Sequence, residues 1–211
     1  MNKFESLVLG IILAPAPILF CFVGAWFTSA MLGFSENIVS ASALSGLGLG
    51  IIVSAIILKR LVRTAYTMSN KALIVLYGFY SILAFGFGMG IPVFNYALGI
   101  VAGVYTARKM CHIRASEKDC RWNIKKAAIF TATVMAIICC LMVLWGLAGN
   151  VDGKDFEILF ESLLKLELTI TVPRFWSIIF FGACAMILLQ YWLTKLAAII
   201  TIKLSGKDFC G

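Results

Sequence analysis

Residues 7–32 read LVLGIILAPAPILFCFVGAWFTSAML and contain no charged side chain. A helix of about 20 predominantly apolar residues crosses the hydrocarbon core of a bilayer, so this run is long enough to span a membrane. It is too long for the apolar core of a secretory signal peptide, and it contains Pro15, Pro17 and Trp26. The run therefore predicts a retained transmembrane helix and not a cleaved signal.

Further apolar runs follow along the chain, separated by short polar connections. They cover residues 41–58, 72–89, 92–107, 127–147 and 175–194. The chain of 211 residues is 62% hydrophobic and 13% charged, whereas about a quarter of the residues of a soluble domain are charged. We therefore predict an all-α fold, a polytopic integral membrane bundle of six transmembrane helices that forms a single domain over residues 1–211.

The third and fourth spans are the shortest and leave one alternative open. Residues 72–107 provide barely enough chain for two spans of about 18 residues each, and Gly90, Ile91 and Pro92 interrupt them. A re-entrant hairpin would also begin and end on the same side of the membrane. The charges on the flanking loops do not distinguish two short spanning helices from such a hairpin.

The basic residues predict how the spans are oriented. Of the 18 Lys and Arg residues, only Lys154, Lys165 and Arg174 fall on the side that alternation of the spans assigns to the outside. Lys and Arg concentrate in cytoplasmic loops, so we expect both termini to lie in the cytoplasm. The expected location is the cytoplasmic membrane of a bacterium or an archaeon, crossed several times.

The net charge of +8 follows from this orientation and does not indicate a nucleic acid partner. The densest basic segment is Arg108–Lys126, which is expected at the inner membrane surface. Basic side chains close to a membrane attract the anionic headgroups of its lipids. The partners that charge predicts are therefore the lipid bilayer and its anionic headgroups.

Three features near the span ends predict further helical structure. Ser116 is followed three residues later by Asp119, the pattern of a helix N-cap, so the fifth helix is expected to begin well before residue 127. Residues 155–168 carry apolar and charged side chains on separate helical faces, which predicts an amphipathic helix on the outer membrane surface. Pro173 suits the first turn of the sixth span.

Glycine pairs spaced four residues apart predict where helices approach closely. The pairs are Gly46 and Gly50, Gly86 and Gly90, and Gly99 and Gly103. Such spacing forms a shallow groove in which another helix gains packing contacts. The groove could be filled by a helix of the same bundle, by a second copy of the chain, or by a partner subunit, and the sequence leaves these alternatives open.

The residues predicted to line a ligand site are Pro15, Pro17, Asn95 and Tyr96. Each proline removes a backbone N–H and frees a carbonyl in the middle of the first span, and transporters use such broken helices at their binding sites. Asn95 is the most polar side chain well inside an apolar run, where Gln190 and several hydroxyls accompany it. We expect a cavity between the first span and the hairpin around residues 86–95.

Catalytic and metal sites are not predicted. Cys111, His112 and Cys120 match no common zinc spacing and lie among basic residues that would repel a cation. No Asp, Glu, Lys, Arg or His falls in the middle of a predicted span, where ionisable residues usually mark proton relays and catalytic centres. We therefore expect no enzymatic activity, no catalytic residue and no cofactor.

The leading functional hypothesis is a binding or transport component for a small neutral or apolar solute. This plan is similar in architecture to the substrate-binding subunits of energy-coupling-factor vitamin transporters, and the similarity carries over no residue. The alternatives are a non-catalytic membrane interaction subunit for assembly, immunity or regulation, and a homo-oligomeric pore. The sequence does not distinguish a substrate, a partner or an oligomeric state.

Overall fold

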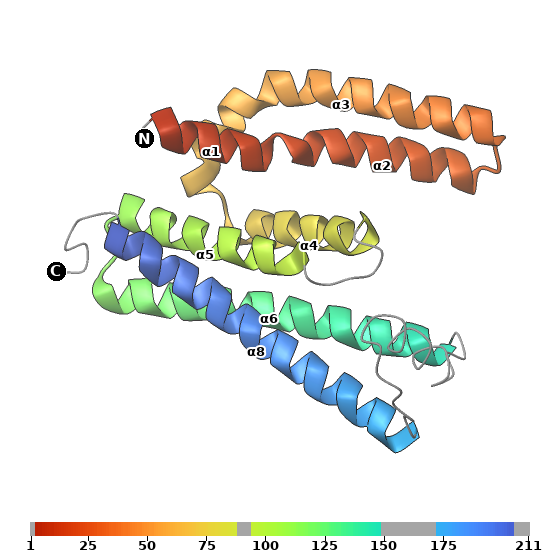
Figure 1. Ribbon diagram of the computed structural model, residues 1–211. Helices are drawn as coiled ribbons and strands as arrows, with labels where there is room; N and C mark the ends of the chain where they lie inside the picture. Colours follow the sequence, from red (N-terminus) through yellow and green to blue (C-terminus); the bar gives the residue numbers. More distant parts are fainter. Residues whose placement is uncertain (1–2, 88–93, 149–171, 205–211) are drawn as a thin grey trace. The chain divides into compact units, whose positions relative to one another are not determined.

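The computed structural model describes residues 3–87, 94–148 and 172–204, and within these ranges the chain is helical and has no strand (Figure 1). The chain divides into two compact units, residues 1–76 (unit 1) and residues 77–211 (unit 2), which are described separately. The predicted amphipathic segment 155–168 and Gly90 lie outside the described residues.

Four helical segments in the described ranges are long and apolar enough to cross a membrane. They are Glu5–Met31, Glu36–Thr67, Glu117–Leu144 and Trp176–Leu204. A shorter apolar helix covers Asn70–Gly86. Large apolar side chains such as Ile56 (73% exposed) and Phe181 (70% exposed) face outward on these segments, which is consistent with helices in a membrane. The fold is thus all-helical with several apolar helices, and the count of six spans stays a prediction.

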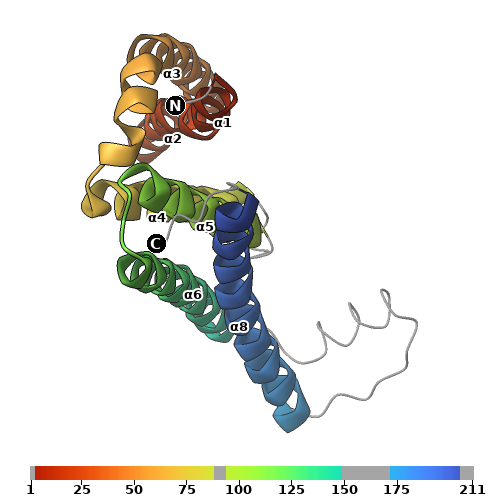
Figure 2. The same cartoon turned by 90° about the vertical axis from the view of Figure 1, so that its left-hand side faces the viewer.

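Unit 1 is a helical hairpin. Helices α1 (Lys3–Leu13) and α2 (Pro15–Met31) follow one another and lie alongside α3 (Glu36–Thr64), which ends in the short 3₁₀ helix η1 (Ala65–Thr67) (Figures 1 and 2). The predicted break in the first span falls at Ala14, directly before Pro15. Gly33 ends α2 with a φ of +71°, a left-handed conformation that glycine adopts without steric strain.

The turn after α2 is a Schellman motif. The Gly33 N–H donates to the Ala30 carbonyl over 3.1 Å, and the Phe34 N–H donates to the Ser29 carbonyl over 3.4 Å. These bonds satisfy carbonyls that the end of a helix otherwise leaves without partners. The chain therefore reverses direction here within a few residues and brings α3 back along α2.

Close backbone contact holds the unit 1 hairpin together. A Cβ added at Gly46 would lie 2.5 Å from the Cys21 carbonyl oxygen, and one added at Gly50 would lie 2.7 Å from the Ile18 Cα. The Ser54 hydroxyl donates to the Ala14 carbonyl over 3.0 Å, so α3 satisfies a carbonyl at the proline break. The glycine groove of α3 is therefore filled by α2 of the same chain.

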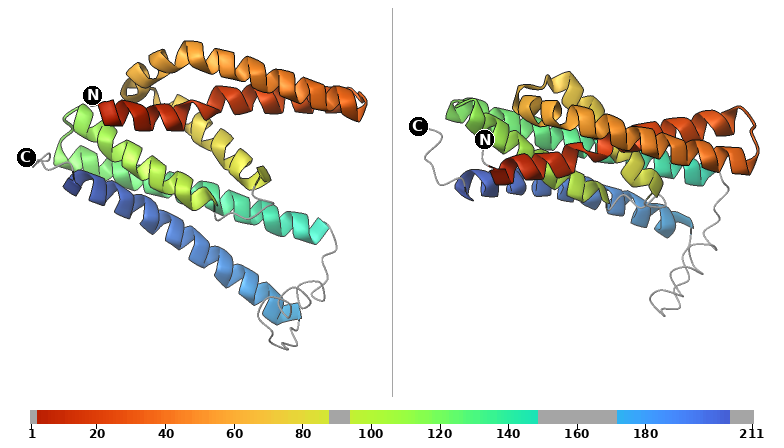
Figure 3. Two further views of the ribbon diagram at one scale, coloured as in Figure 1. Left: turned by 45° about the horizontal axis from the view of Figure 1, so that its top comes forward. Right: turned by 90° about the horizontal axis from the view of Figure 1, so that it is seen from above.

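The described residues of unit 2 form four helices, of which α4 begins before the unit boundary. They are α4 (Asn70–Phe87), α5 (Phe94–His112), α6 (Glu117–Ala148) and α8 (Val172–Leu204). Helix α8 packs against both α5 and α6, which also contact each other (Figure 3). Pro173 lies in the first turn of α8, as predicted. The helices α3, α6 and α8 all extend beyond the apolar runs predicted for them, and charged residues lie in their additional turns.

Rows of buried residues, most of them small or polar, lie on the helices α5 and α8, which contact each other. The buried residues of α5 are Asn95, Gly99, Gly103, Ala107 and Met110. The buried residues of α8 are Gln190, Thr194, Ala198 and Thr201. Both rows recur every three or four residues, so each occupies one helical face. Small residues let two helix backbones approach closely, which is how helices gain packing energy in a membrane.

The connection from α5 to α6 places a non-glycine residue in a left-handed conformation. Arg114 has a φ of 49°, and the Ala115 N–H donates to the Met110 carbonyl over 3.1 Å. Ser116 then caps α6, since its hydroxyl accepts the Asp119 N–H over 3.2 Å and donates to the Asp119 carboxylate over 2.7 Å. The predicted early start of the fifth helix is thereby confirmed.

Candidate binding site: a buried polar cluster in unit 2

Polar side chains gather in the interior of unit 2. The most deeply buried are Ser81 (2% exposed), Asn95 (1%), Thr131 (0%), Gln190 (0%) and Thr194 (1%). They come from α4, α5, α6 and α8, so each described helix of the unit contributes at least one. A polar group in an apolar interior needs a hydrogen-bond partner, because it has lost its contacts with water.

Gln190 lies at the centre of this cluster. Its Nε2 donates to the Tyr77 hydroxyl over 3.3 Å and to the Asn95 backbone carbonyl over 3.2 Å. One turn further along α8, the Thr194 hydroxyl donates to the Gln190 backbone carbonyl over 3.0 Å and lies 2.9 Å from the Thr131 hydroxyl. These bonds connect α8 to α4, α5 and α6. Tyr77 also packs edge-on against Phe130, with 5.3 Å between ring centroids.

Gly99 and Gly103 of α5 allow the face of α8 that carries Gln190 and Thr194 to approach closely. A Cβ added at Gly99 would collide with the Gln190 side-chain amide and would lie 2.9 Å from the Thr194 hydroxyl. A Cβ added at Gly103 would collide with the Thr194 backbone carbonyl. Glycine at these positions therefore allows α8 to bring a long polar side chain into the interior.

Three carboxamide atoms of the cluster lack hydrogen-bond partners within the described part of the chain. They are Asn95 Nδ2 and Oδ1 and Gln190 Oε1. Ser81 lies one turn after Tyr77 on α4, so the two side chains share a helical face. Leaving one such group buried and unpaired costs about 1–3 kcal/mol. The cluster thus offers both donors and acceptors to a molecule that enters it.

The predicted ligand residues divide between the two units. Asn95 belongs to the buried cluster, whereas its neighbour Tyr96 is half-buried and makes none of the cluster's hydrogen bonds. Pro15 and Pro17 lie in unit 1, at the break between α1 and α2. The cavity predicted between the first span and the hairpin therefore stays a prediction. The sequence analysis did not predict Gln190 as a ligand residue. Its carboxamide lies inside an apolar run, which is the signal that could have identified it.

The predicted glycine grooves have different surroundings. The pairs on α3 and α5 are each covered by another helix of the same unit. Gly86 differs, because a Cβ added there would meet nothing within 4 Å among the described residues. The packing role predicted for Gly86 and Gly90 therefore stays a prediction.

Comparisons with protein-family models, with curated proteins and with solved structures gave no match. The functional argument therefore rests on the chemistry of the side chains. Within the described ranges, no group of three or more His, Cys, Asp and Glu side chains could hold a metal ion. The cluster itself consists of carboxamides and hydroxyls, which can bind a neutral molecule by hydrogen bonds.

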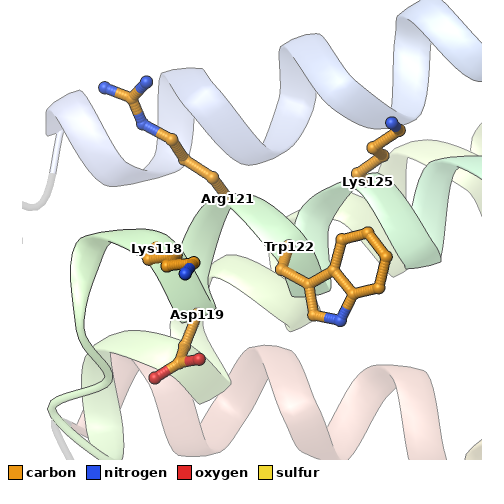
Figure 4. Close-up of a pocket in the computed structure, with 5 residues that line it drawn as sticks. All are labelled: Lys118, Asp119, Arg121, Trp122 and Lys125. Atoms are coloured by element: carbon orange, nitrogen blue, oxygen red, sulfur yellow. The ribbon is translucent and has the colours of Figure 1, made fainter.

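A second polar region lies outside the apolar runs, at the start of α6. Lys118, Asp119, Arg121, Trp122 and Lys125 line an open depression there (Figure 4). It belongs to the basic segment Arg108–Lys126 that the sequence predicts to meet anionic lipid headgroups. At the other end of that segment, burial lowers the pKa of Lys109 from its ordinary value, because partial burial disfavours the charged ammonium.

Proposed function

We propose that this protein is a membrane-embedded binding or transport component for a small neutral solute, which it holds at the buried cluster of unit 2. The observation that carries the proposal is the Asn95 carboxamide, which is 1% exposed and has no partner for either Nδ2 or Oδ1 within the described ranges. A solute that both donates and accepts hydrogen bonds would satisfy these atoms together with Gln190 Oε1.

The solute is expected to be neutral because the cluster supplies no counter-charge. Its members are Tyr, Ser, Asn, Thr and Gln side chains, and no ionisable Asp, Glu, Lys, Arg or His occupies the middle of a predicted span. Burying an unpaired charge at membrane depth is costly. For the same reason we propose no catalytic step, since these groups include no general acid or base that titrates near neutral pH.

The proposed topology has six spans in a cytoplasmic membrane, with both termini in the cytoplasm. It is supported by four helices of sufficient length and apolar character and by the concentration of Lys and Arg in alternate connections. Green fluorescent protein fused after Gly211 should fluoresce, because it folds on the cytoplasmic side. A dark but membrane-inserted fusion would contradict the proposed orientation.

Native mass spectrometry of the protein purified in mild detergent tests the proposed function. The wild type should be a monomer that retains a discrete small molecule. Asn95→Leu, which replaces the carboxamide with an apolar group of similar size, should remain folded and lose that molecule. Thr133→Val is the matched control, because the exposed Thr133 hydroxyl donates to the Ile129 carbonyl of its own helix.

Two outcomes would overturn the proposal. Retention of the small molecule by Asn95→Leu would remove the cluster from the binding site. A defined oligomer that carries only lipid would favour the pore or the interaction subunit. For either of those alternatives the contact surface would have to lie outside the glycine grooves of α3 and α5, because helices of the chain already fill them.

A further inference from the structure

We propose that the first turns of α6 form a binding site for the headgroup of an anionic phospholipid, built from Lys118, Trp122 and Lys125. These residues are four and three positions apart, so they share one face of the helix. Figure 4 shows them following one another along α6, with the Arg121 side chain extending away from the Trp122 ring. This site is separate from the buried cluster and does not depend on the solute proposed above.

The position of these residues along α6 matches the depth of a headgroup. The helix begins at Glu117, and its uncharged run begins at Ala127. Trp122 lies five residues before Ala127, which corresponds to about 7.5 Å along the helix axis. The headgroup region adds about 5–8 Å to each side of the hydrocarbon core. Trp122 and Lys125 therefore lie in this region when the apolar run spans the core, and the long Lys118 side chain can reach toward it.

The local acidic residues have partners that leave the two lysines available. Glu117 forms an ion pair with Arg121. The Asp119 carboxylate accepts the Ser116 hydroxyl in the cap of α6. Neither Lys118 nor Lys125 has an ion-pair partner among the described residues, and both are exposed. Their positive charges are therefore available to a phosphate group.

Trp122 favours a lipid headgroup over free phosphate as the occupant. Its side chain is 55% exposed, and the Lys126 ammonium lies 4.9 Å from its ring centroid. Tryptophan concentrates at membrane interfaces because its ring is apolar and its N–H is polar. An apolar ring beside two lysines complements a lipid, which offers glycerol and acyl carbons next to its phosphate, whereas a free phosphate ion offers no apolar group to the ring.

Quenching of Trp122 fluorescence by brominated lipids tests the site in the full chain. The four other tryptophans are first replaced by phenylalanine: Trp26, Trp145, Trp176 and Trp192. The protein is then reconstituted in mixtures of brominated phosphatidylglycerol or brominated phosphatidylcholine with unbrominated lipid, and the quenching curves yield a relative binding constant. We expect a preference for phosphatidylglycerol of about fivefold for each contributing lysine.

Substitutions separate a specific site from the general surface potential. Lys118→Gln with Lys125→Gln should abolish the preference, and Lys118→Arg with Lys125→Arg should retain it. The control is Lys59→Gln with Lys71→Gln, which removes the same charge from exposed positions of unit 1 and should leave the preference unchanged. Equal loss in the control, or no preference in the parent protein, would overturn the proposal. Displacement of the quenching lipid by millimolar inorganic phosphate would overturn the choice of a lipid occupant.

Discussion

Gln190 on α8 donates from its Nε2 to the backbone carbonyl of Asn95 on α5, over 3.2 Å. This bond uses the Gln190 nitrogen and the Asn95 backbone. The Asn95 carboxamide and the Gln190 Oε1 are buried without partners in the described part of the chain. Helix α8 is therefore fixed to α5 through the Asn95 backbone, while the Asn95 side chain keeps its donors and acceptor for a ligand. The interior of unit 2 thus contains a hydrogen bond that joins α5 to α8 and, beside it, polar atoms that have no partner among the described residues.

The closest approach of α5 to α8 should be sensitive to a single methyl group. Gly103→Ala would push a Cβ into the Thr194 backbone carbonyl, and backbone cannot move as cheaply as a flexible side chain. We expect a loss of about 1–3 kcal/mol in the free energy of unfolding, measured by denaturant titration in detergent micelles. Gly182→Ala on α8 is the control, because its Cβ meets nothing within 4 Å. Equal effects of the two substitutions would contradict this packing.

The hydroxyl pair between α6 and α8 should contribute a measurable coupling energy. Thr131 and Thr194 are fully buried, with 2.9 Å between their hydroxyl oxygens. A double-mutant cycle of Thr131→Val and Thr194→Val should give a coupling of about 0.6 kcal/mol, the average for hydrogen bonds between membrane helices. The same cycle with Thr133→Val in place of Thr131→Val should give no coupling, since the exposed Thr133 bonds within its own helix.

Arg114 occupies a backbone conformation that favours glycine. Its φ of 49° costs an L-residue about 1–2 kcal/mol, so Arg114→Gly should stabilise the protein by about 1 kcal/mol after the added flexibility of the unfolded chain is counted. Thermal unfolding in detergent is the measurement. Arg114→Ala removes the same charge but keeps the Cβ, and it should give no gain. Equal stabilisation by both variants would attribute the effect to charge.

The role of the proline break in ligand binding can be tested directly. Pro15→Ala with Pro17→Ala restores two backbone N–H groups to the first span. If the predicted cavity includes this break, the double variant should lose affinity for the small molecule that the wild type retains, while the protein stays folded. Unchanged retention, measured by native mass spectrometry, would remove Pro15 and Pro17 from the site and leave Asn95 and Tyr96 as the predicted ligand residues.

Several local features could be predicted from the sequence because they depend on nearby residues. The break at Ala14 follows from Pro15, which lacks an N–H for the preceding helix turn. The start of α6 follows from Ser116, whose hydroxyl accepts the Asp119 N–H. The ends of α3 and α8 could not be located from hydropathy, because a helix continues through charged residues once it leaves the apolar core.

The sequence by itself determined that the chain is helical and apolar, since long uncharged runs must satisfy their own backbone in lipid. Only the tertiary structure decided which faces of those helices meet. Glycine spacing was the same at Gly86 and at Gly99, yet only Gly99 faces a neighbouring helix among the described residues. The pairing of Gln190 with Asn95 joins residues far apart along the chain. Such contacts depend on how whole helices pack, which the period of one helix does not specify.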